Sequence, residues 1–315
     1  MRIDGNSESE RKEDGMKAET ERFRGIFPAL ITPYRRDGSI NEDSLRRLVS
    51  RCLDRGVSGF YVCGSTGEAF MLSSDERKQI LEIVIDENSG RGTIIAHVGC
   101  IGTDGSIELA VHARGAGADA ISSVPPFYYG FTVDEIVSHY RAVTHAADMP
   151  MILYNFPANA GVSLTPALVR RLRGEDRRIV GLKHTSMNLY DLEQMLRIDD
   201  DFVVLAGHDE VLLGALSMGA RGAVGSTYNI MPELYVEMIK RLESGDLAGA
   251  QEIQQRVNSF IRLMSPGTGI PQIKAALELV GIECNGCRRP MAALAPSQRS
   301  GIEKALKEIG IPLGA

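Results

Sequence analysis

The sequence predicts a (β/α)8 barrel followed by a C-terminal helical extension. From Gly25 onward, short apolar runs alternate with segments of helical periodicity, a pattern typical of parallel α/β folds. Eight such runs precede residue 247 at the spacing of compact βα units, and eight repeats in one domain favour a closed barrel over an open doubly wound sheet. The predicted strands are residues 26–33, 58–63, 93–99, 119–125, 150–156, 179–185, 202–207 and 222–227.

The segments between these strands carry helix signals. Residues 41–55 repeat apolar side chains at helical spacing behind Asn41, a residue favoured at N-caps. Two capping boxes and an N-cap followed by proline mark further helix starts at Ser73 with Glu76, Thr132 with Glu135, and Thr165-Pro166. After an eighth helix at about 232–244, helical patterns continue in the segments 247–264, 270–280 and 297–308.

The chain therefore divides into three parts. Residues 1–24 are polar, mixed in charge and without periodicity, so we expect a flexible N-terminal tail. Residues 25–246 are expected to form the barrel, and residues 247–315 the helical extension rather than a second domain with its own site.

Composition narrows the classes of function. The formal net charge is −6 and no basic cluster occurs, which argues against a nucleic-acid partner. No apolar run is long enough to cross a bilayer and the charged N-terminus lacks a signal core, so we expect a cytoplasmic protein with no membrane partner. Five cysteines, an odd number, fit a reducing compartment. Cys284 and Cys287 form a lone CxxC, which we interpret as free thiols rather than a zinc site.

Lys183 is the first candidate for chemistry. It lies in the apolar run 179–185, whereas lysine is rarely buried unless a group pairs with it or uses it. Burial favours the neutral, nucleophilic form of an amine, as in lysines that form Schiff bases. A lysine that reaches solvent from a strand end, or that pairs with a carboxylate, explains the same sequence equally well. The strand alone leaves these interpretations open.

Polar residues gather directly after the predicted strands, which is the face on which barrels carry their active sites. Lys183 and Thr185 close the sixth strand. The other clusters are Gly64-Ser65-Thr66-Gly67-Glu68, Pro126-Phe127-Tyr128-Tyr129, Tyr154-Asn155, Gly207-His208-Asp209-Glu210 and Gly225-Ser226-Thr227-Tyr228. Their common location indicates a site more strongly than any single motif does.

The turn after the second strand suits an anion. Residues 64–67 offer backbone N–H groups and the hydroxyls of Ser65 and Thr66, which fit a carboxylate as well as a phosphate. A strand-to-helix turn that simply needs glycine torsions has the same sequence. Neither GxGxxG nor a P-loop occurs here, which argues against a bound dinucleotide or nucleotide.

Three more residues have two interpretations each. Tyr154 either transfers a proton to a substrate or is an inward-facing aromatic of the barrel. Asp209 and Glu210 either accept hydrogen bonds from a polyhydroxylated ligand or stabilise a helix N-terminus.

Six histidines are scattered singly and supply no matching ligand set, so we expect no metal.

At these residues the chain resembles the pyruvate-dependent class I aldolases, the family that includes dihydrodipicolinate synthase and N-acetylneuraminate lyase. The resemblance runs from about residue 25 to at least residue 230. Asn159 stands where the synthase branch carries an arginine, and His184 where that branch usually has an acidic residue, so the lyase branch matches better. The motifs are GSTGE at 64–68, YNxP at 154–157 and the strand lysine, with support from 64–70, 95–100, 126–129, 183–186, 209–210 and 225–231.

The resemblance implies a retro-aldol cleavage of N-acetylneuraminate to pyruvate and N-acetylmannosamine, through a Schiff base on Lys183 and without a cofactor. It implies that Ser65 and Thr66 hold the substrate carboxylate. It also implies a proton relay of Ser65, Tyr154 and Tyr128, the last from a neighbouring subunit of a homotetramer. The residues matched to the polyol tail are Thr185, Gly207, Asp209, Glu210 and Ser226.

Asn159, His208 and the segment 267–274 depart from the lyase pattern and leave the exact sugar acid open. The nearest alternative is another aldolase or dehydratase of the family that acts on a 2-keto-3-deoxy sugar acid. Dihydrodipicolinate synthase (4-hydroxy-tetrahydrodipicolinate synthase) ranks lower for want of the arginine. Outside catalysis, a sugar-acid sensor would keep the same pocket without turnover, and fold alone also permits a phosphate-handling barrel.

Overall fold

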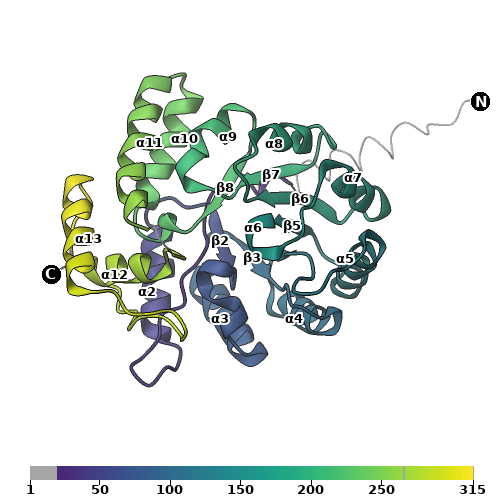
Figure 1. Cartoon of the computed structure of the whole chain (residues 1–315), viewed down its shortest axis with the longest axis horizontal. Helices are drawn as coiled ribbons and strands as arrows, with labels where there is room; N and C mark the ends of the chain where they lie inside the picture. The colour runs from purple at the N-terminus through teal and green to yellow at the C-terminus, as the bar shows by residue number, and fades with distance from the viewer. Residues whose placement is uncertain (1–19, 265–266, 315) are drawn as a thin grey trace, which may run out of the picture.

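The computed structural model of the chain describes residues 20–264 and 267–314, and within them eight parallel strands form a barrel surrounded by helices (Figure 1). This confirms the predicted fold. The strands are shorter than predicted because the backbone leaves the sheet where the polar clusters begin. They are β1 (Gly25–Pro28), β2 (Gly59–Val62), β3 (Thr93–His97), β4 (Ala120–Ser123), β5 (Met151–Asn155), β6 (Ile179–His184), β7 (Val203–Ala206) and β8 (Gly222–Gly225).

The strands follow the order β1-β8-β7-β6-β5-β4-β3-β2. Backbone contacts between the segments around β1 and β2 close the ring. The Ser58 N–H donates to the Ile26 carbonyl at 2.9 Å, and a parallel bridge joins Ala29 to Tyr61. Neighbouring strands are in parallel register, so all eight carboxyl ends meet on one face. The polar clusters predicted after the strands therefore share that face.

Asn229 links the chain segments that follow the first and last strands. Its Oδ1 accepts from the Ile31 N–H at 3.1 Å, and its Nδ2 donates to the Ala29 carbonyl at 2.8 Å. The same Nδ2 donates to the Ser226 carbonyl at 2.8 Å. One buried side chain thus joins backbone positions that are about two hundred residues apart in the sequence.

The predicted helix starts are confirmed. Asn41 Oδ1 accepts from the Ser44 N–H at 3.2 Å, Ser73 and Thr132 form reciprocal capping boxes, and Thr165 caps a helix that begins with proline. The barrel helices are α2 (Glu42–Leu53), α3 (Ser74–Asn88), α4 (Thr103–Ala116), α5 (Val133–Ala147), α6 (Pro157–Ala160), α7 (Pro166–Glu175), α8 (Leu189–Leu196), α9 (Leu212–Ser217) and α10 (Pro232–Glu243).

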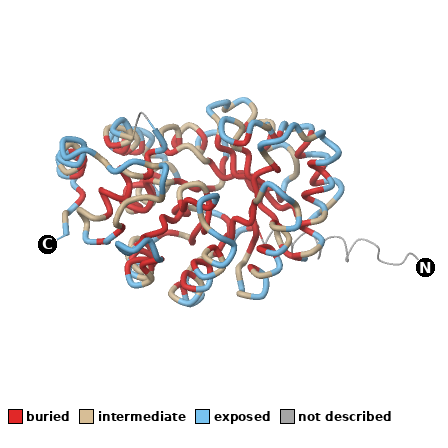
Figure 2. Tube along the Cα trace, turned by 60° about the horizontal axis from the view of Figure 1, so that its bottom comes forward, coloured by how far each residue is buried: buried red, intermediate tan, exposed pale blue. Residues whose placement is uncertain are grey.

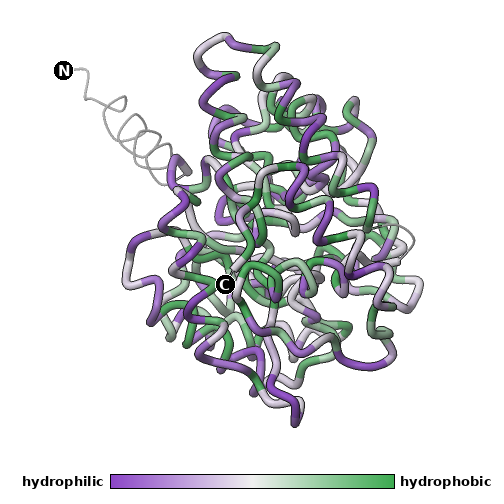
Figure 3. The backbone as a smooth tube through the Cα atoms, turned by 90° about the vertical axis from the view of Figure 1, so that its left-hand side faces the viewer, coloured by the Kyte–Doolittle hydropathy of each residue, from purple (hydrophilic) through white to green (hydrophobic). Residues whose placement is uncertain are grey.

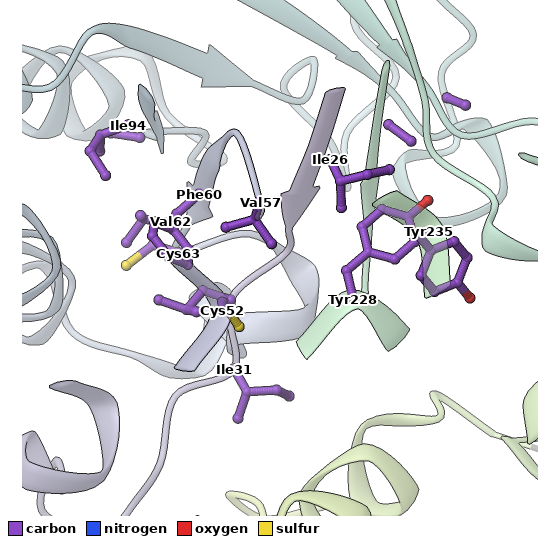
Figure 4. Packing of buried hydrophobic residues seen from close by; sticks show 14 of the residues in the cluster. Ile26, Ile31, Cys52, Val57, Phe60, Val62, Cys63, Ile94, Tyr228 and Tyr235 are labelled. Atoms are coloured by element: carbon purple, nitrogen blue, oxygen red, sulfur yellow. The ribbon is translucent and has the colours of Figure 1, made fainter. Parts of the chain in front are cut away.

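Apolar side chains occupy two regions, one inside the barrel and one between its strands and the helices. Ile26, Phe60 and Val62 point outward from their strands into the larger region, where Tyr228 and Tyr235 lie side by side (Figure 4). Alternate strand positions fill the interior. Burial is concentrated around the strands (Figure 2), and hydrophilic stretches lie mainly on the outer helices and loops (Figure 3).

The predicted N-terminal tail needs a correction at its C-terminal end. Residues 1–19 lie outside the described residues, but residues 20–24 are folded against the barrel. Phe23 is fully buried and belongs to the interior cluster, and Arg22 forms an ion pair with Asp119 at 2.8 Å. Burial of this aromatic ring in the barrel interior keeps residues 20–24 folded, although most of the residues around it are charged.

The C-terminal extension consists of α11 (Leu247–Ile261), α12 (Ile270–Leu279) and α13 (Pro296–Glu308), as predicted from their periodicity. Gln254 and Asn258 of α11 donate to the backbone carbonyls of Asp209 and Glu210, each at 3.0 Å. The extension is therefore attached to the loop that follows β7. No helix in residues 20–264 or 267–314 is both long and apolar enough to span a bilayer.

Candidate active site

A cavity of about 660 Å³ opens at the carboxyl ends of the strands. Tyr128 is the only predicted site residue that does not line it. The nine that do are Ser65, Thr66, Tyr154, Lys183, Thr185, Gly207, Asp209, Glu210 and Ser226. Residues from five different β-strands or the loops that follow them are thus brought together, because parallel strands of a barrel all end on the same face.

Lys183 lies on β6 with its amine inside this cavity. The residue is 4% exposed, and Nζ lies 4.0 Å from the centre of the Tyr154 ring and 4.5 Å from that of Tyr61. Among the described residues no carboxylate forms an ion pair with this amine. The two other interpretations of the sequence, an amine in bulk solvent and an amine paired with a carboxylate, are therefore wrong. What remains is a lysine amine held by aromatic faces and available to a ligand.

Tyr154 is both an inward-facing barrel aromatic and a cavity residue, so its two interpretations coincide. It is 2% exposed, and its hydroxyl lies 3.5 Å from the hydroxyl of Ser65. Its ring stacks on Phe156 at a centroid distance of 5.9 Å and meets Tyr61 edge-on at 5.8 Å. The packing fixes the direction of the phenol, which faces the Ser65 turn and the lysine.

Tyr61 is a site neighbour that the sequence interpretation missed. Burial raises the pKa of its phenol well above the usual value, and its hydroxyl donates to Ser122 Oγ at 2.8 Å. The phenol is therefore neutral, and its ring packs against the lysine amine. Its inward position in the second strand, two residues before Cys63, was the available signal, since alternate strand positions face the barrel interior.

The turn between β2 and α3 is a short 3₁₀ helix at Ser65–Gly67. Both glycines are needed by packing, because a Cβ at Gly64 would lie 2.7 Å from the Tyr61 ring and one at Gly67 would lie 2.9 Å from the Leu30 carbonyl. The glycine-torsion interpretation was thus incomplete: close approach, rather than a positive φ, requires these two residues. The turn presents the Ser65 and Thr66 side chains to the cavity.

A second polar wall comes from the strand ends of β6, β7 and β8. Thr185 Oγ1 is buried and has no hydrogen-bond partner among the described residues. It packs against Gly207, where a Cβ would lie only 1.9 Å from that oxygen. Glycine at this position therefore makes room for the threonine hydroxyl, which is left unpaired for a ligand.

Asp209 and Glu210 occupy different environments on this wall. Asp209 is buried, which raises the pKa of its carboxyl, while Thr227 donates to Oδ2 through its N–H at 2.9 Å and its hydroxyl at 2.6 Å. Glu210 lies 3.3 Å from His208 Nδ1, and this contact lowers the pKa of the glutamate. Asp209 thus has a structural hydrogen-bond role as well as a place in the cavity wall, whereas Glu210 is the freer acceptor.

Tyr128 lies outside the cavity of its own chain. It is 83% exposed, and its φ of +78° is unfavourable for a residue other than glycine. Its ring meets that of Tyr129 edge-on at a centroid distance of 5.0 Å. Two adjacent exposed aromatic rings on a strained loop are typical of a contact surface. The prediction that this hydroxyl serves another subunit's site stays a prediction.

No cluster of three metal-ligating side chains occurs in the described parts of the chain. Cys284 and Cys287 are free thiols, as interpreted from the sequence, and burial raises their pKa values to about 12 and about 11. Both sulfurs are therefore protonated at neutral pH and poorly suited as metal ligands.

The positions that depart from the lyase pattern also line the cavity. Asn159 and His208 are part of its wall, as are residues 267–270 of the segment 267–274. Lys274, at the end of that segment, instead forms an ion pair with Glu68. The unfamiliar residues therefore line the same cavity as Lys183.

The motifs, the barrel and the cavity agree with comparisons to known proteins. The model of the dihydrodipicolinate synthetase family matches residues 22–309. This chain belongs to that family. Among curated members, it is 40% identical over 291 residues to the N-acetylneuraminate lyase of Enterobacter sp. (strain 638), which covers 91% of this chain and 97% of that lyase. The resemblance inferred from the motifs is confirmed.

Solved structures of family members give the same result. A Ruminococcus gnavus sialic acid aldolase with a mutated catalytic lysine superposes with a TM-score of 0.89 at 33% identity, covering 92% of this chain and 96% of that one. YagE, an E. coli K12 prophage protein of the dihydrodipicolinic acid synthase family in complex with pyruvate, gives 0.88 at 29% identity, covering 92% and 99%. Because members with different names share the fold equally, the cavity residues have to distinguish their activities.

Proposed function

We propose that this protein is a Schiff-base aldolase that cleaves N-acetylneuraminate to pyruvate and N-acetylmannosamine. The observation that carries the proposal is the amine of Lys183, buried in the cavity without a carboxylate partner among the described residues and 4.0 Å from the Tyr154 ring. The 40% identity to a lyase of that activity supports the choice of substrate.

In this mechanism the neutral amine of Lys183 attacks the C2 ketone of the open-chain sugar acid. Loss of water gives a protonated imine, or iminium, that joins C2 to Nζ. The substrate carboxylate lies on the turn of Ser65 and Thr66, whose hydroxyls and backbone N–H groups orient it and balance its charge.

Tyr154 then removes the proton from the C4 hydroxyl, directly or through the substrate carboxylate. As the C4 carbonyl forms, the C3–C4 bond breaks and its electron pair moves into the iminium, which becomes an enamine. N-acetylmannosamine leaves first. Protonation of C3 and hydrolysis of the resulting iminium release pyruvate and restore the free amine. The nitrogen accepts the electrons of the broken bond, so the reaction requires neither a metal nor an organic cofactor.

The wall opposite the reacting ketone would hold the hydroxyls of the sugar. Thr185 Oγ1 has no partner among the described residues, and Glu210 is a half-exposed carboxylate at the cavity. Ser226, Asp209 and the backbone at Gly207 complete this set. A buried hydroxyl-binding wall discriminates strongly, because a substrate without the hydroxyl leaves these groups unpaired.

We also propose a homotetramer in which Tyr128 enters the cavity of a neighbouring subunit and extends the relay of Ser65 and Tyr154. Its exposure and its strained φ of +78° support this role. The protein is proposed to work in the cytoplasm, where a reducing environment suits its five free cysteines.

The test is a substrate panel with pyruvate release as the readout. N-acetylneuraminate, a 2-keto-3-deoxy sugar acid and a simple 4-hydroxy-2-oxo acid are compared by kcat/KM. We expect N-acetylneuraminate to be the best substrate. A higher kcat/KM for the 2-keto-3-deoxy acid would assign the chain to the aldolases or dehydratases that act on such acids. The cavity residues Asn159 and His208, which depart from the lyase pattern, are the reason to include this substrate. Tight binding of N-acetylneuraminate with no pyruvate released would indicate a sensor.

A further inference from the structure

Glu68 and Lys274 form a deeply buried ion pair beside the turn that is proposed to bind the substrate carboxylate. Glu68 directly follows Ser65–Gly67 and lines the same cavity. Its Oε1 lies 2.5 Å from Lys274 Nζ, and the two side chains are 0% and 1% exposed. No other ion pair within the described residues has both partners buried to this extent.

Both carboxylate oxygens of Glu68 are held by the C-terminal extension. Lys274 lies in α12 and also donates to the Gly286 carbonyl at 2.7 Å, with its amine 4.0 Å from the centre of the Tyr34 ring. The backbone N–H of Arg288 donates to Glu68 Oε2 at 2.8 Å. The barrel supplies the carboxylate, and the extension supplies the groups that fix it.

The backbone at Glu68 gives these contacts a further role. Its φ of 62° and ψ of 30° are left-handed, a conformation that a residue other than glycine adopts only where its surroundings hold it. Its N–H donates to the Ser65 carbonyl at 3.1 Å, so the same residue closes the carboxylate-binding turn. Releasing the side chain would therefore release the strained end of the turn.

The pair also joins two parts of the cavity wall. Ser65 and Thr66 line it on the barrel side, while Gly269 and Ile270, at the start of the helix that carries Lys274, line it on the side of the extension. A single buried contact thus sets the position of the turn relative to the segment that bounds the pocket.

Electrostatics gives a second reason for the pair. An unneutralised Glu68 would place a negative charge next to a site for a carboxylate, and Lys274 compensates this charge. Stability does not explain the pair, because replacing a buried ion pair by apolar groups is often neutral or stabilising. The location of the ion pair next to the proposed carboxylate site explains why both charges are present.

We infer that Glu68 and Lys274 are positioning residues that set the affinity of the active site for the carboxylate of the 2-oxo acid. The inference rests on the proposed function, which supplies the ligand of the Ser65 turn. It assigns to the C-terminal extension a part in binding pyruvate and the pyruvyl end of the sugar acid, while the sugar end is held elsewhere.

The experiment uses the full chain and the double substitution Glu68→Gln with Lys274→Met, which removes both charges at nearly constant volume. Arg173→Met with Asp201→Asn is the matched control. These two side chains also form a buried ion pair, with a distance of 2.7 Å between Nη2 and Oδ2. Asp201 lies just before β7, so this pair is at the end of the barrel opposite the cavity. KM is measured for pyruvate and for N-acetylmannosamine in the condensation direction. The concentration of pyruvate that half-saturates borohydride trapping on Lys183 gives an independent affinity.

We expect the double variant to raise the pyruvate KM and the half-saturating concentration at least about tenfold, the effect of losing one hydrogen bond to a charged group. The KM for N-acetylmannosamine should change much less, and the control should change neither constant. Equal changes in both constants, or no change in either, would overturn the inference. If the double variant does not fold, Glu68→Asp serves, because it keeps both charges but shortens the side chain that holds the turn, with the same expected split between the two substrates.

Failure of this inference differs from failure of the proposed function. If the unmodified protein forms no adduct with pyruvate, the proposed chemistry is wrong. If the unmodified protein forms the adduct and the double variant binds pyruvate equally well, the aldolase proposal stands and only the role of Glu68 and Lys274 is lost.

Discussion

Tyr154 and Lys183 are directly paired across the parallel strands β5 and β6, with the lysine amine 4.0 Å from the centre of the tyrosine ring. Two adjacent strands thus place the proposed nucleophile and the proposed proton-transfer group side by side, without a contribution from a loop. Strands hold such groups more rigidly than loops do, and rigid placement is what a reaction with several proton transfers requires.

Lys183→Ala is expected to keep the fold and abolish adduct formation, because the amine is the proposed nucleophile. Borohydride reduction in the presence of pyruvate, followed by peptide mass mapping, checks this in the unmodified protein and the variant. Lys240→Ala, a substitution at an exposed position, is the control. This variant should be labelled at Lys183, like the unmodified protein. A label on any other lysine would refute the assignment.

Tyr154→Phe is expected to form the iminium with pyruvate yet to turn over about 10²–10⁴ times more slowly, the usual contribution of general acid–base catalysis. The ring and its packing on Phe156 are kept, so only the hydroxyl near Ser65 is lost. Trapping reports the first step and kcat reports the whole cycle. Turnover equal to that of the unmodified protein would remove Tyr154 from the mechanism.

Gly207→Ala is expected to raise the KM for N-acetylneuraminate while pyruvate trapping on Lys183 persists. The new Cβ would lie 1.9 Å from Thr185 Oγ1 and 2.9 Å from the Thr185 Cα, so the hydroxyl wall has to move. Steady-state kinetics and trapping together make the comparison. Gly115→Ala, a helical position with open space around it, is the control. An unchanged KM would show that this wall does not contact the sugar.

Mixed oligomers test whether Tyr128 acts in a neighbouring subunit. Tyr128→Phe and Lys183→Ala chains should each be nearly inactive alone, and activity should return when the two are coexpressed and assembled together. A site with an intact lysine then receives an intact Tyr128 from the other chain. If Tyr128 acts within its own chain, every site of the mixed oligomer lacks one group and no activity returns.

The stability of the protein is expected to fall as the pH drops from about 6.5 to about 4, and His139 contributes to this loss. Burial lowers the pKa of His139 from 6.5 to about 4, so between these values the unfolded chain binds a proton there that the folded chain does not. The contribution is up to about 3 kcal/mol, since one pKa unit corresponds to about 1.4 kcal/mol. Burial lowers the pKa values of His97 and His184 as well, with the same sign.

Urea unfolding of His139→Gln at pH 7 and pH 4.5 isolates this contribution. The difference in unfolding free energy between the two pH values should be smaller than in the unmodified protein. His145→Gln, at an exposed position of the same helix, serves as the control. An identical pH dependence in His139→Gln and in the unmodified protein would contradict the expectation.

The fold was predictable because the strands are apolar runs followed by polar residues, and four of the helices begin at a side-chain cap, at Asn41, Ser73, Thr132 and Thr165. The tail boundary was misplaced because Phe23 contacts residues distant in sequence, and one aromatic within a charged segment gives no periodic signal. Propensity and periodicity report local structure, and a contact made only in the folded barrel does not show in them.

The residues that line the candidate site were predictable, but the contacts between them were not. The resemblance placed Lys183, Tyr154 and Ser65 at one location, and the cavity brings them together. The pairing of Glu68 with Lys274 was not foreseen, because the two are separated by about two hundred residues and neither departs from ordinary composition. Tyr61 was missed because an inward-facing aromatic is indistinguishable in sequence from one that only packs.

Asn229 sets a limit on when the candidate active site can form during protein synthesis. Its side chain joins the loops after the first and last strands, and those contacts span about two hundred residues of sequence. Contacts of such separation form late, since a long loop has to be ordered first. While the eighth strand is still inside the ribosome, the cavity around Lys183 therefore lacks the residues that follow this strand. The proposed reaction with a ketone can begin only after the barrel has closed.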